Sequence, residues 1–228
     1  MPVRSKSDGL GMSLHTIELP TEPMESVTGV IKDCRYIGSY DWSPDATKNN
    51  PSIVIPGMIT SFSSSPHLIY HRSIPNTGSP NIWTEPRLPI QIPPDQGRQI
   101  RDNNNYILKG QPFLPLLVAI NEQQIFPHKE WKSVDFITDR SGLRKLLRWI
   151  GGVGGRDFRI DTQLVGDRTI IFNRWEAVDT ELMHGNTFSS NFAKTVTKPM
   201  PPSTERSSWH HRVVTYVGRL SIIIVWSW

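Results

Sequence analysis

The sequence has very little cysteine, and this scarcity excludes two kinds of architecture. Cys34 is the single cysteine among 228 residues, so the chain has no internal disulfide framework and no zinc site built from several cysteines. A chain with so little cysteine is typical of a reducing compartment. We therefore expect an intracellular protein in the nucleus or the cytoplasm, since no run of lysine and arginine is dense enough to choose between the two.

Long apolar runs are also missing from the sequence. Residues 1–8 lack the apolar stretch of a secretory signal, and no segment reaches the roughly 20 consecutive apolar residues that span a bilayer. We therefore expect a soluble protein with no membrane partner. Residues 1–27 are polar and have no sustained hydrophobic period, which predicts a mobile N-terminal segment.

Proline, by contrast, is abundant in the first half of the chain. Most of the 19 prolines lie between Pro51 and Pro115, which predicts an irregular stretch over about residues 51–115. Within it we expect a short strand at residues 52–56 and a short helix begun by Pro115. The length predicts a single domain over residues 28–228. The net charge of +4 permits an anionic partner, although such a surplus is common on ordinary solvated surfaces.

Residues 134–176 carry the clearest succession of structural signals. Residues 134–139 alternate as in a short strand, and the period then changes to that of an amphipathic helix with a basic face made by Arg144, Lys145 and Arg148. Asp139 or Ser141 can cap this helix, and Gly151–Gly152 end it. Its apolar stripe consists of Leu143, Leu146, Leu147 and Ile150.

A β-hairpin is predicted after the helix. Apolar residues alternate over residues 158–164, Gly166–Asp167 supply a turn, and a second strand follows over residues 169–176. A further helix is predicted at 188–197 and a final strand at 212–228. The fold class is therefore α+β, with a central mixed or antiparallel sheet and flanking helices. The residues expected to be buried are Leu143, Leu146, Leu147, Ile150, Phe158, Ile160, Ile170 and Phe172.

The segment 138–147, Thr-Asp-Arg-Ser-Gly-Leu-Arg-Lys-Leu-Leu, followed by a hairpin that ends in Phe-Asn-Arg-Trp-Glu, resembles the core of the DXO-type decapping and 5′-end RNA nucleases. It resembles more closely a group of uncharacterised fungal proteins. Two later stretches, at 191–194 and 210–216, are similar to segments that hold or precede acidic motifs of the family. The resemblance covers residues 130–228, with a looser match at 36–57, and implies a decapping-nuclease-like domain that is incomplete at its C-terminus.

The resemblance also implies which chemistry is missing. A metal-dependent phosphodiesterase needs several carboxylates around Mg²⁺ or Mn²⁺, because these hard cations prefer oxygen ligands. In the family the ligands come from a Phe-Glu pair, a Glu-x-Asp strand and a Glu-x-Lys strand. Here the Phe-Glu position is Ala193, and the sequence runs to Trp228, like a truncated or frame-shifted end, without either acidic strand. We therefore expect that the family's Mg²⁺ or Mn²⁺ is not bound.

What remains of the family pattern lies on the side that faces the substrate. Arg140 matches the family's phosphate-contacting arginine, and Glu176 matches one acidic hairpin position, which makes Glu176 the remaining catalytic or metal-binding candidate. Arg174 replaces another acid. The resemblance and the basic helix face together indicate four residues that could bind an RNA 5′ end or a nucleotide. These substrate-binding candidates are Arg140, Arg144, Lys145 and Arg148.

Each of these residues also has a purely structural interpretation. Arg140 can be a helix-start residue paired with Asp139 or Asp135, and Glu176 can be a strand-end carboxylate paired with Arg174.

Three hypotheses follow for the function. The first is a degenerate nuclease-like domain that has lost hydrolysis and retains weak RNA or nucleotide binding. The second is an active metal-dependent RNA-end hydrolase with replacement ligands from Asp161, Asp167, Glu176 or a second chain. The third is a non-catalytic protein-interaction scaffold that uses the proline-rich half.

Overall fold

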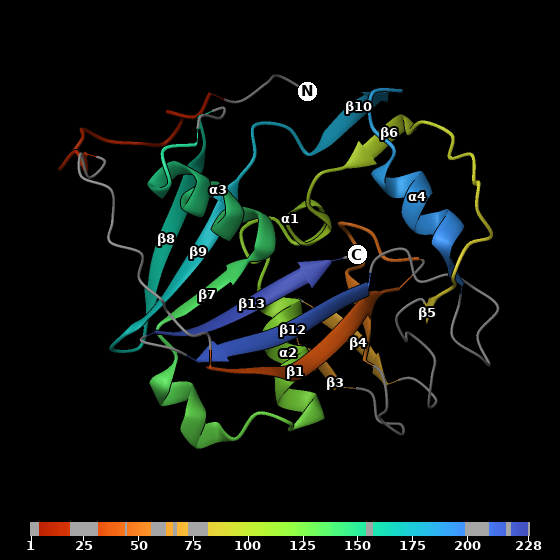
Figure 1. The fold of residues 1–228 in the computed structure, drawn as a ribbon. Helices are drawn as coiled ribbons and strands as arrows, with labels where there is room; N and C mark the ends of the chain where they lie inside the picture. The colour runs from red at the N-terminus through yellow and green to blue at the C-terminus, as the bar shows by residue number, and fades with distance from the viewer. Residues whose placement is uncertain are drawn as a thin grey trace. The chain divides into compact units, whose positions relative to one another are not determined.

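The structure is a computed structural model, and it describes residues 5–18, 32–43, 45–55, 63–65, 68–72, 82–153, 157–198, 210–217 and 220–227 (Figure 1). The chain is α+β, as the sequence predicts, with helices and several sheets. Among the described residues, no helix has both the length and the apolar character needed to cross a membrane.

The chain divides into two units. The first comprises Met1–Tyr36, Pro127–Val178 and Val214–Trp226, and the second comprises Ile37–Phe126, Asp179–Val213 and Ser227–Trp228.

The first unit is built on strands in the order β13-β7-β9-β8. Strand β7 is parallel to both β13 and β9, whereas β8 and β9 form an antiparallel hairpin. Helix α3 follows β7 directly and lies against β7 and β9 (Figure 1). The elements are a 3-10 helix at His128–Ser133, β7 (Phe136–Asp139), α3 (Arg140–Ile150), β8 (Arg159–Val165), β9 (Thr169–Trp175) and β13 (Ser221–Ser227).

The predicted succession of strand, helix and hairpin is confirmed in this unit. Asp139 caps α3, since its Oδ1 accepts a hydrogen bond of 2.6 Å from the backbone N–H of Gly142. The helix ends at the predicted glycines, where Gly152 has a φ of 64°. Gly166 has a φ of 62° in the hairpin turn. Residues other than glycine rarely adopt a positive φ, which explains why glycine occupies the end of the helix and the hairpin turn.

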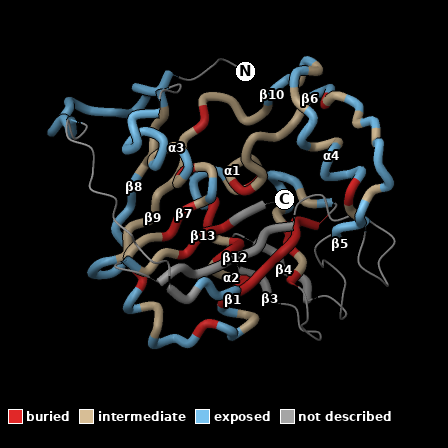
Figure 2. The backbone as a smooth tube through the Cα atoms, viewed as in Figure 1, coloured by how far each residue is buried: buried red, intermediate tan, exposed pale blue. Residues whose placement is uncertain are grey.

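The predicted burial of the helix stripe is wrong. Leu147 is 56% exposed and Ile150 is 38% exposed, and the other six residues expected to be buried are half-buried: Leu143, Leu146, Phe158, Ile160, Ile170 and Phe172. The core of the unit lies instead on β7, on β13 (Figure 2) and just before β7, at Val134, Ile137, Ile223, Ile224 and Val225. Periodicity identifies residues that share one face of a helix, but it does not say how much of that face another element covers.

The second unit holds a mixed sheet in the order β3-β4-β2-β1 and two small antiparallel sheets, β10-β6 and β11-β5. Helix α2 contacts β2. The elements are β2 (Ser52–Ile55), β3 (Ser63–Ser65), β4 (Leu68–Arg72), β5 (Ile82–Trp83), β6 (Gln96–Ile100), α1 (Asn103–Ile107), α2 (Leu114–Gln123), β10 (Thr180–His184), α4 (Ser189–Val196) and β11 (Thr197–Lys198), with the second part of β1 (Lys32–Trp42) and the first part of β12 (His210–Val217). Residues 32–36 of β1 and 214–217 of β12 belong to the first unit.

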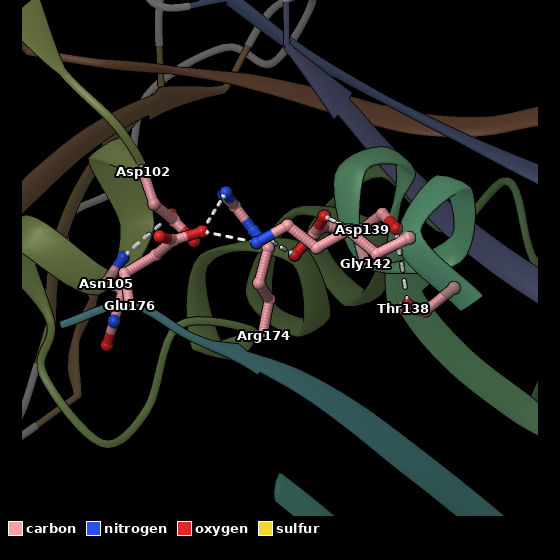
Figure 3. Close-up of polar contacts among 8 residues, drawn as sticks. Asp102, Asn105, Thr138, Asp139, Gly142, Arg174 and Glu176 are labelled. Atoms are coloured by element: carbon pink, nitrogen blue, oxygen red, sulfur yellow. Dashed lines mark hydrogen bonds and ion pairs between the residues drawn. The ribbon is translucent and has the colours of Figure 1, made fainter. Parts of the chain in front are cut away.

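A buried polar group connects β1 to α1 in this unit. The Asn104 side chain donates to Tyr40 Oη at 2.8 Å and accepts from Trp42 Nε1 at 2.9 Å. Asp102 caps α1 by accepting from the backbone N–H of Asn105 at 3.0 Å (Figure 3). Burial raises the pKa of the Tyr40 hydroxyl well above its usual value. These bonds satisfy the polar atoms that the aromatic side chains of β1 bring into the core.

Two predictions about the rest of the chain need correction. Besides the predicted β2, residues 51–115 contain β3 to β6 and α1, so they hold more regular structure than the proline content predicts. Strand β6, for example, pairs with β10, 80 to 88 positions away, and such long-range pairing has no local signature. The single strand predicted at 212–228 is two strands, β12 and β13. Strand β2, the start of α2 and helix α4 are confirmed.

Candidate functional site

Glu176 lies just after β9 and is held by two cations from the same unit. Its Oε1 accepts a hydrogen bond of 2.7 Å from Arg174 Nη1 and one of 2.9 Å from Lys145 Nζ. The side chain of Arg174 extends to a second carboxylate, because its Nε lies 3.4 Å from Asp139 Oδ2 (Figure 3). Asp139, Lys145, Arg174 and Glu176, hereafter the carboxylate cluster, therefore form one connected set of ion pairs.

The local structure explains why these four side chains meet. Residues Arg174 and Glu176 are two positions apart on an extended segment, so their side chains lie on the same face. Asp139 is the last residue of β7, which is the neighbour of β9 in the sheet. Lys145 lies on α3, which follows β7 and contacts β9. A strand, its parallel neighbour and the helix between them thus bring the cluster together.

The cluster is electrically balanced, and its central ion pair between Arg174 and Glu176 is poorly hydrated. It contains two carboxylates and two cations, and the side chains of Glu176 and Arg174 are 9% and 11% exposed. A charge at such a site needs a nearby partner of opposite sign, since water contributes little to its stability. A divalent cation would therefore have to compete with Arg174 and Lys145 for the same Glu176 oxygen.

The structural interpretation of Glu176 as a carboxylate paired with Arg174 is confirmed, and Lys145 is a second partner that the sequence did not indicate. Within the described ranges, no group of three or more His, Cys, Asp and Glu side chains is placed to hold a metal ion. Ala193, which the sequence resemblance sets at the Phe-Glu position of the decapping nucleases, lies on α4 and is exposed.

The other predicted site residues lie along α3. Arg140, Arg144 and Arg148 are exposed and recur every four residues, so they follow one another along one side of the helix at intervals of about 6 Å along its axis. We call these three residues the arginine row. Lys145 was expected to belong with them, but its ammonium contacts Glu176. The row therefore presents guanidinium groups, which suit bidentate contacts with phosphate.

Asp135, one of the two partners considered for Arg140, has other contacts. Its carboxylate accepts a hydrogen bond from the Arg168 side chain and one of 2.8 Å from the backbone N–H of Ser221. The hydrogen bond from Arg168 is the main cause that lowers the pKa of Asp135, and the backbone bond adds to it. Asp135 thus connects the starts of β7 and β13 within the first unit.

Sequence reasoning missed Asp95 in the second unit. Its carboxylate is buried and accepts hydrogen bonds from the backbone N–H of Asn191 at 2.8 Å, the Thr187 hydroxyl at 2.9 Å and the backbone N–H of Ser190 at 3.2 Å. Burial alone would raise the pKa of Asp95, but these hydrogen bonds outweigh it and lower the pKa. Asp95 therefore caps α4 from more than 90 positions away, a relationship with no local sequence signal.

The fold and the site together define an α+β protein with a neutralised carboxylate cluster beside a helix that carries a row of arginines. The chain belongs to the family described as Domain of unknown function (DUF8563), whose model matches residues 67–226. The match includes β7, α3, the β8–β9 hairpin and α4. No curated protein and no solved structure matches the chain.

Proposed function

We propose that this chain is a decapping-nuclease-like domain that binds RNA 5′ ends or nucleotides weakly and does not hydrolyse them. The observation that carries this proposal is the pairing of Glu176 with both Arg174 and Lys145. The sequence resemblance makes Glu176 the acidic group that remains from the family's metal site. In this chain the same carboxylate neutralises two cations, so it stabilises the fold around α3 and β9.

Loss of hydrolysis follows from the count of ligands at the positions that the resemblance indicates. A hydrolytic Mg²⁺ or Mn²⁺ site takes at least two protein carboxylates in addition to substrate phosphate and water. Glu176 is engaged by two cations, Arg174 adds a positive charge where the decapping enzymes have an acid, and Ala193 offers no side-chain oxygen. A metal at these positions would meet repulsion from the two cations and a single carboxylate, one oxygen of which already accepts from both Arg174 and Lys145.

Retention of anion binding is supported by the arginine row. The N-terminus of α3 is itself occupied by Asp139, so a phosphate would not bind at the end of the helix dipole. Exposed guanidinium groups spaced along one side of the helix instead give several phosphate contacts on a flexible ligand. Affinity built from such contacts is modest and falls steeply as salt rises.

Binding of a 5′-monophosphorylated single-stranded RNA, measured by fluorescence anisotropy over a range of salt concentrations, tests this proposal. The double substitution Arg144→Ala and Arg148→Ala should weaken binding and reduce the slope of log K against log salt by about 0.7 for each lost phosphate contact. Lys129→Ala with Lys132→Ala is the matched control, because both lysines are exposed on the 3-10 helix of the same unit and their removal changes the net charge equally.

The outcomes separate the candidate functions. An equal loss in both double variants would mean that binding reflects net charge alone, and the arginine row would not be the site. No detectable binding of the wild-type chain at low salt would favour the protein-interaction scaffold. RNA cleavage by the wild-type chain with Mn²⁺ would favour the active hydrolase.

A further inference from the structure

Three exposed aromatic side chains in the second unit come from β5, from α4 and from the residue that precedes α4. Trp83 is 60% exposed, and Phe188 and Phe192 are 50% and 43% exposed. The rings of Trp83 and Phe192 are in contact, with centroids 6.2 Å apart and planes inclined by 52°. Phe188 is one helical turn before Phe192, whose backbone N–H donates to the Phe188 carbonyl at 2.8 Å. We call these three residues the aromatic platform.

The backbone beneath the aromatic platform is held at both ends of α4. At the C-terminal end, β11 pairs with β5 so that Thr197 is opposite Trp83, and the Thr84 N–H donates to the Val196 carbonyl at 2.7 Å. At the N-terminal end, the buried Asp95 accepts from the first turn of the helix. The rings are therefore presented by ordered backbone, which lowers the entropy lost when a ligand binds them.

The aromatic platform is not the side of α4 that builds the core. Val196 is the buried apolar residue of this helix, and it is almost fully covered. Large aromatic side chains gain little from facing water, so a group of three that touch or follow one another outside the core indicates a ligand surface.

The charges around the aromatic platform favour an anionic ligand. Residues 189–198 contain two lysines, Lys194 and Lys198, and no acidic residue, so with the buried Asp95 at the start of α4 the local charges leave a surplus of one positive charge. Around Trp83, the charges of Glu85 and Arg87 cancel. A surface that combines aromatic rings with a positive surplus is what single-stranded nucleic acid binds, because its bases stack on rings while its phosphates need cations.

We infer that the aromatic platform stacks the bases of single-stranded RNA, with Trp83 and Phe192 as the principal rings. The inference rests on the proposed function for its choice of ligand, but it adds a second site with different chemistry. The arginine row contacts phosphates, whereas the aromatic platform contacts bases. Since every base has a π face, the platform should bind with little preference for sequence.

A pair of oligomers separates the two sites. One is a single-stranded oligouridylate, and the other is an abasic oligomer with the same length and phosphate count. We expect the wild-type chain to bind the oligouridylate more tightly. Trp83→Ala should weaken oligouridylate binding by roughly five- to 100-fold, in line with the loss of one stacked base, and should leave the abasic affinity unchanged.

Further variants distinguish stacking from general apolar contact. Trp83→Phe keeps a ring and should retain most of the preference for bases, whereas Trp83→Leu keeps apolar bulk without a ring and should lose it. Leu182→Ala removes an exposed apolar side chain from β10 in the same unit and should change neither affinity. Far-UV circular dichroism and the melting temperature identify any variant that fails to fold. In that case Phe192→Leu, which leaves β5 untouched, provides the second measurement of the loss of stacking.

The possible failures can be told apart. Equal binding of the two oligomers by the wild-type chain, or an unchanged preference in Trp83→Leu, overturns the stacking inference and leaves the arginine row in place. A preference for bases that disappears in Trp83→Leu, together with affinities for both oligomers that are unchanged in Arg144→Ala with Arg148→Ala, overturns the arginine row and supports the aromatic platform. Failure to bind either oligomer at low salt overturns both.

Discussion

Arg174 and Glu176 are two positions apart in the sequence and form an ion pair of 2.7 Å with largely buried side chains. The sequence resemblance expects an acid at both positions, where two carboxylates would repel each other unless a metal lay between them. The arginine supplies that positive charge from within the protein. The first unit therefore has its own counter-ion at this point, and the contacts of Arg174 with both Glu176 and Asp139 stabilise the packing of α3 on β9.

The first prediction concerns the stability supplied by Arg174. Arg174→Ala would leave the carboxylates of Asp139 and Glu176 with less compensation in a poorly hydrated site, and should lower the free energy of unfolding by about 3 to 5 kcal/mol. Lys6→Ala is the control, because the pair of Lys6 with Asp157 is exposed and 3.8 Å long, and such pairs contribute about 0 to 1 kcal/mol. Urea unfolding measures both, and equal losses would contradict the assigned role of Arg174.

The second prediction concerns the stripe of α3. Leu147→Ala should change the free energy of unfolding by less than about 0.5 kcal/mol, because Leu147 is mainly exposed. Ile137→Ala, at a buried position of β7, should lower it by about 2 to 5 kcal/mol. Thermal or urea unfolding of the two variants compares them directly. A large loss in Leu147→Ala would mean that the stripe is covered by another element in solution.

The third prediction concerns acid. Asp95 and Asp135 both have lowered pKa values in the folded chain, so each stabilises the folded state above the ordinary aspartate pKa of about 3.9. That stability is lost as the pH falls below this value and through the folded-state pKa. Unfolding measured from pH 7 downward should show a steep loss of stability below about pH 4.

Asp95→Asn tests the contribution of Asp95 to this acid dependence. The variant removes the titrating group while keeping an oxygen that can accept from the first turn of α4, so its stability should fall less steeply below about pH 4 than that of the wild type. If the two chains show the same pH dependence, the hydrogen bonds to Asp95 do not favour its charged form as assigned.

The fourth prediction concerns catalysis under the proposed function. Purified protein with millimolar Mn²⁺ should leave capped, triphosphorylated and monophosphorylated RNA intact, as judged by gel electrophoresis. Ala193→Glu alone should not produce cleavage, because Glu176 would still be paired with Arg174 and Lys145. Cleavage by the wild-type chain that disappears in Glu176→Gln would show that Glu176 takes part in a working metal site, and would contradict the proposal.

Local sequence determined the elements between residues 134 and 176. The signals there are local, since each acts over a few neighbouring residues. They are the alternation of a strand, the 3.6-residue period of a helix, a capping aspartate and two glycines in the left-handed region. Strand β7, helix α3 and the β8–β9 hairpin therefore lie where those signals predict them. The pairing of Arg174 with Glu176 was also within reach of the sequence, because two positions on one strand share a face.

Tertiary structure alone decided burial and distant partners. The sequence predicted that the apolar residues of α3 share one face of the helix. How far Leu147 and Ile150 are exposed, however, depends on which elements pack beside the helix. Likewise, Lys145 meets Glu176 because β7 and β9 are parallel neighbours, and Asp95 caps α4 because the chain folds back on itself. Such contacts join segments far apart in sequence, and neither partner carries a local pattern that points to the other.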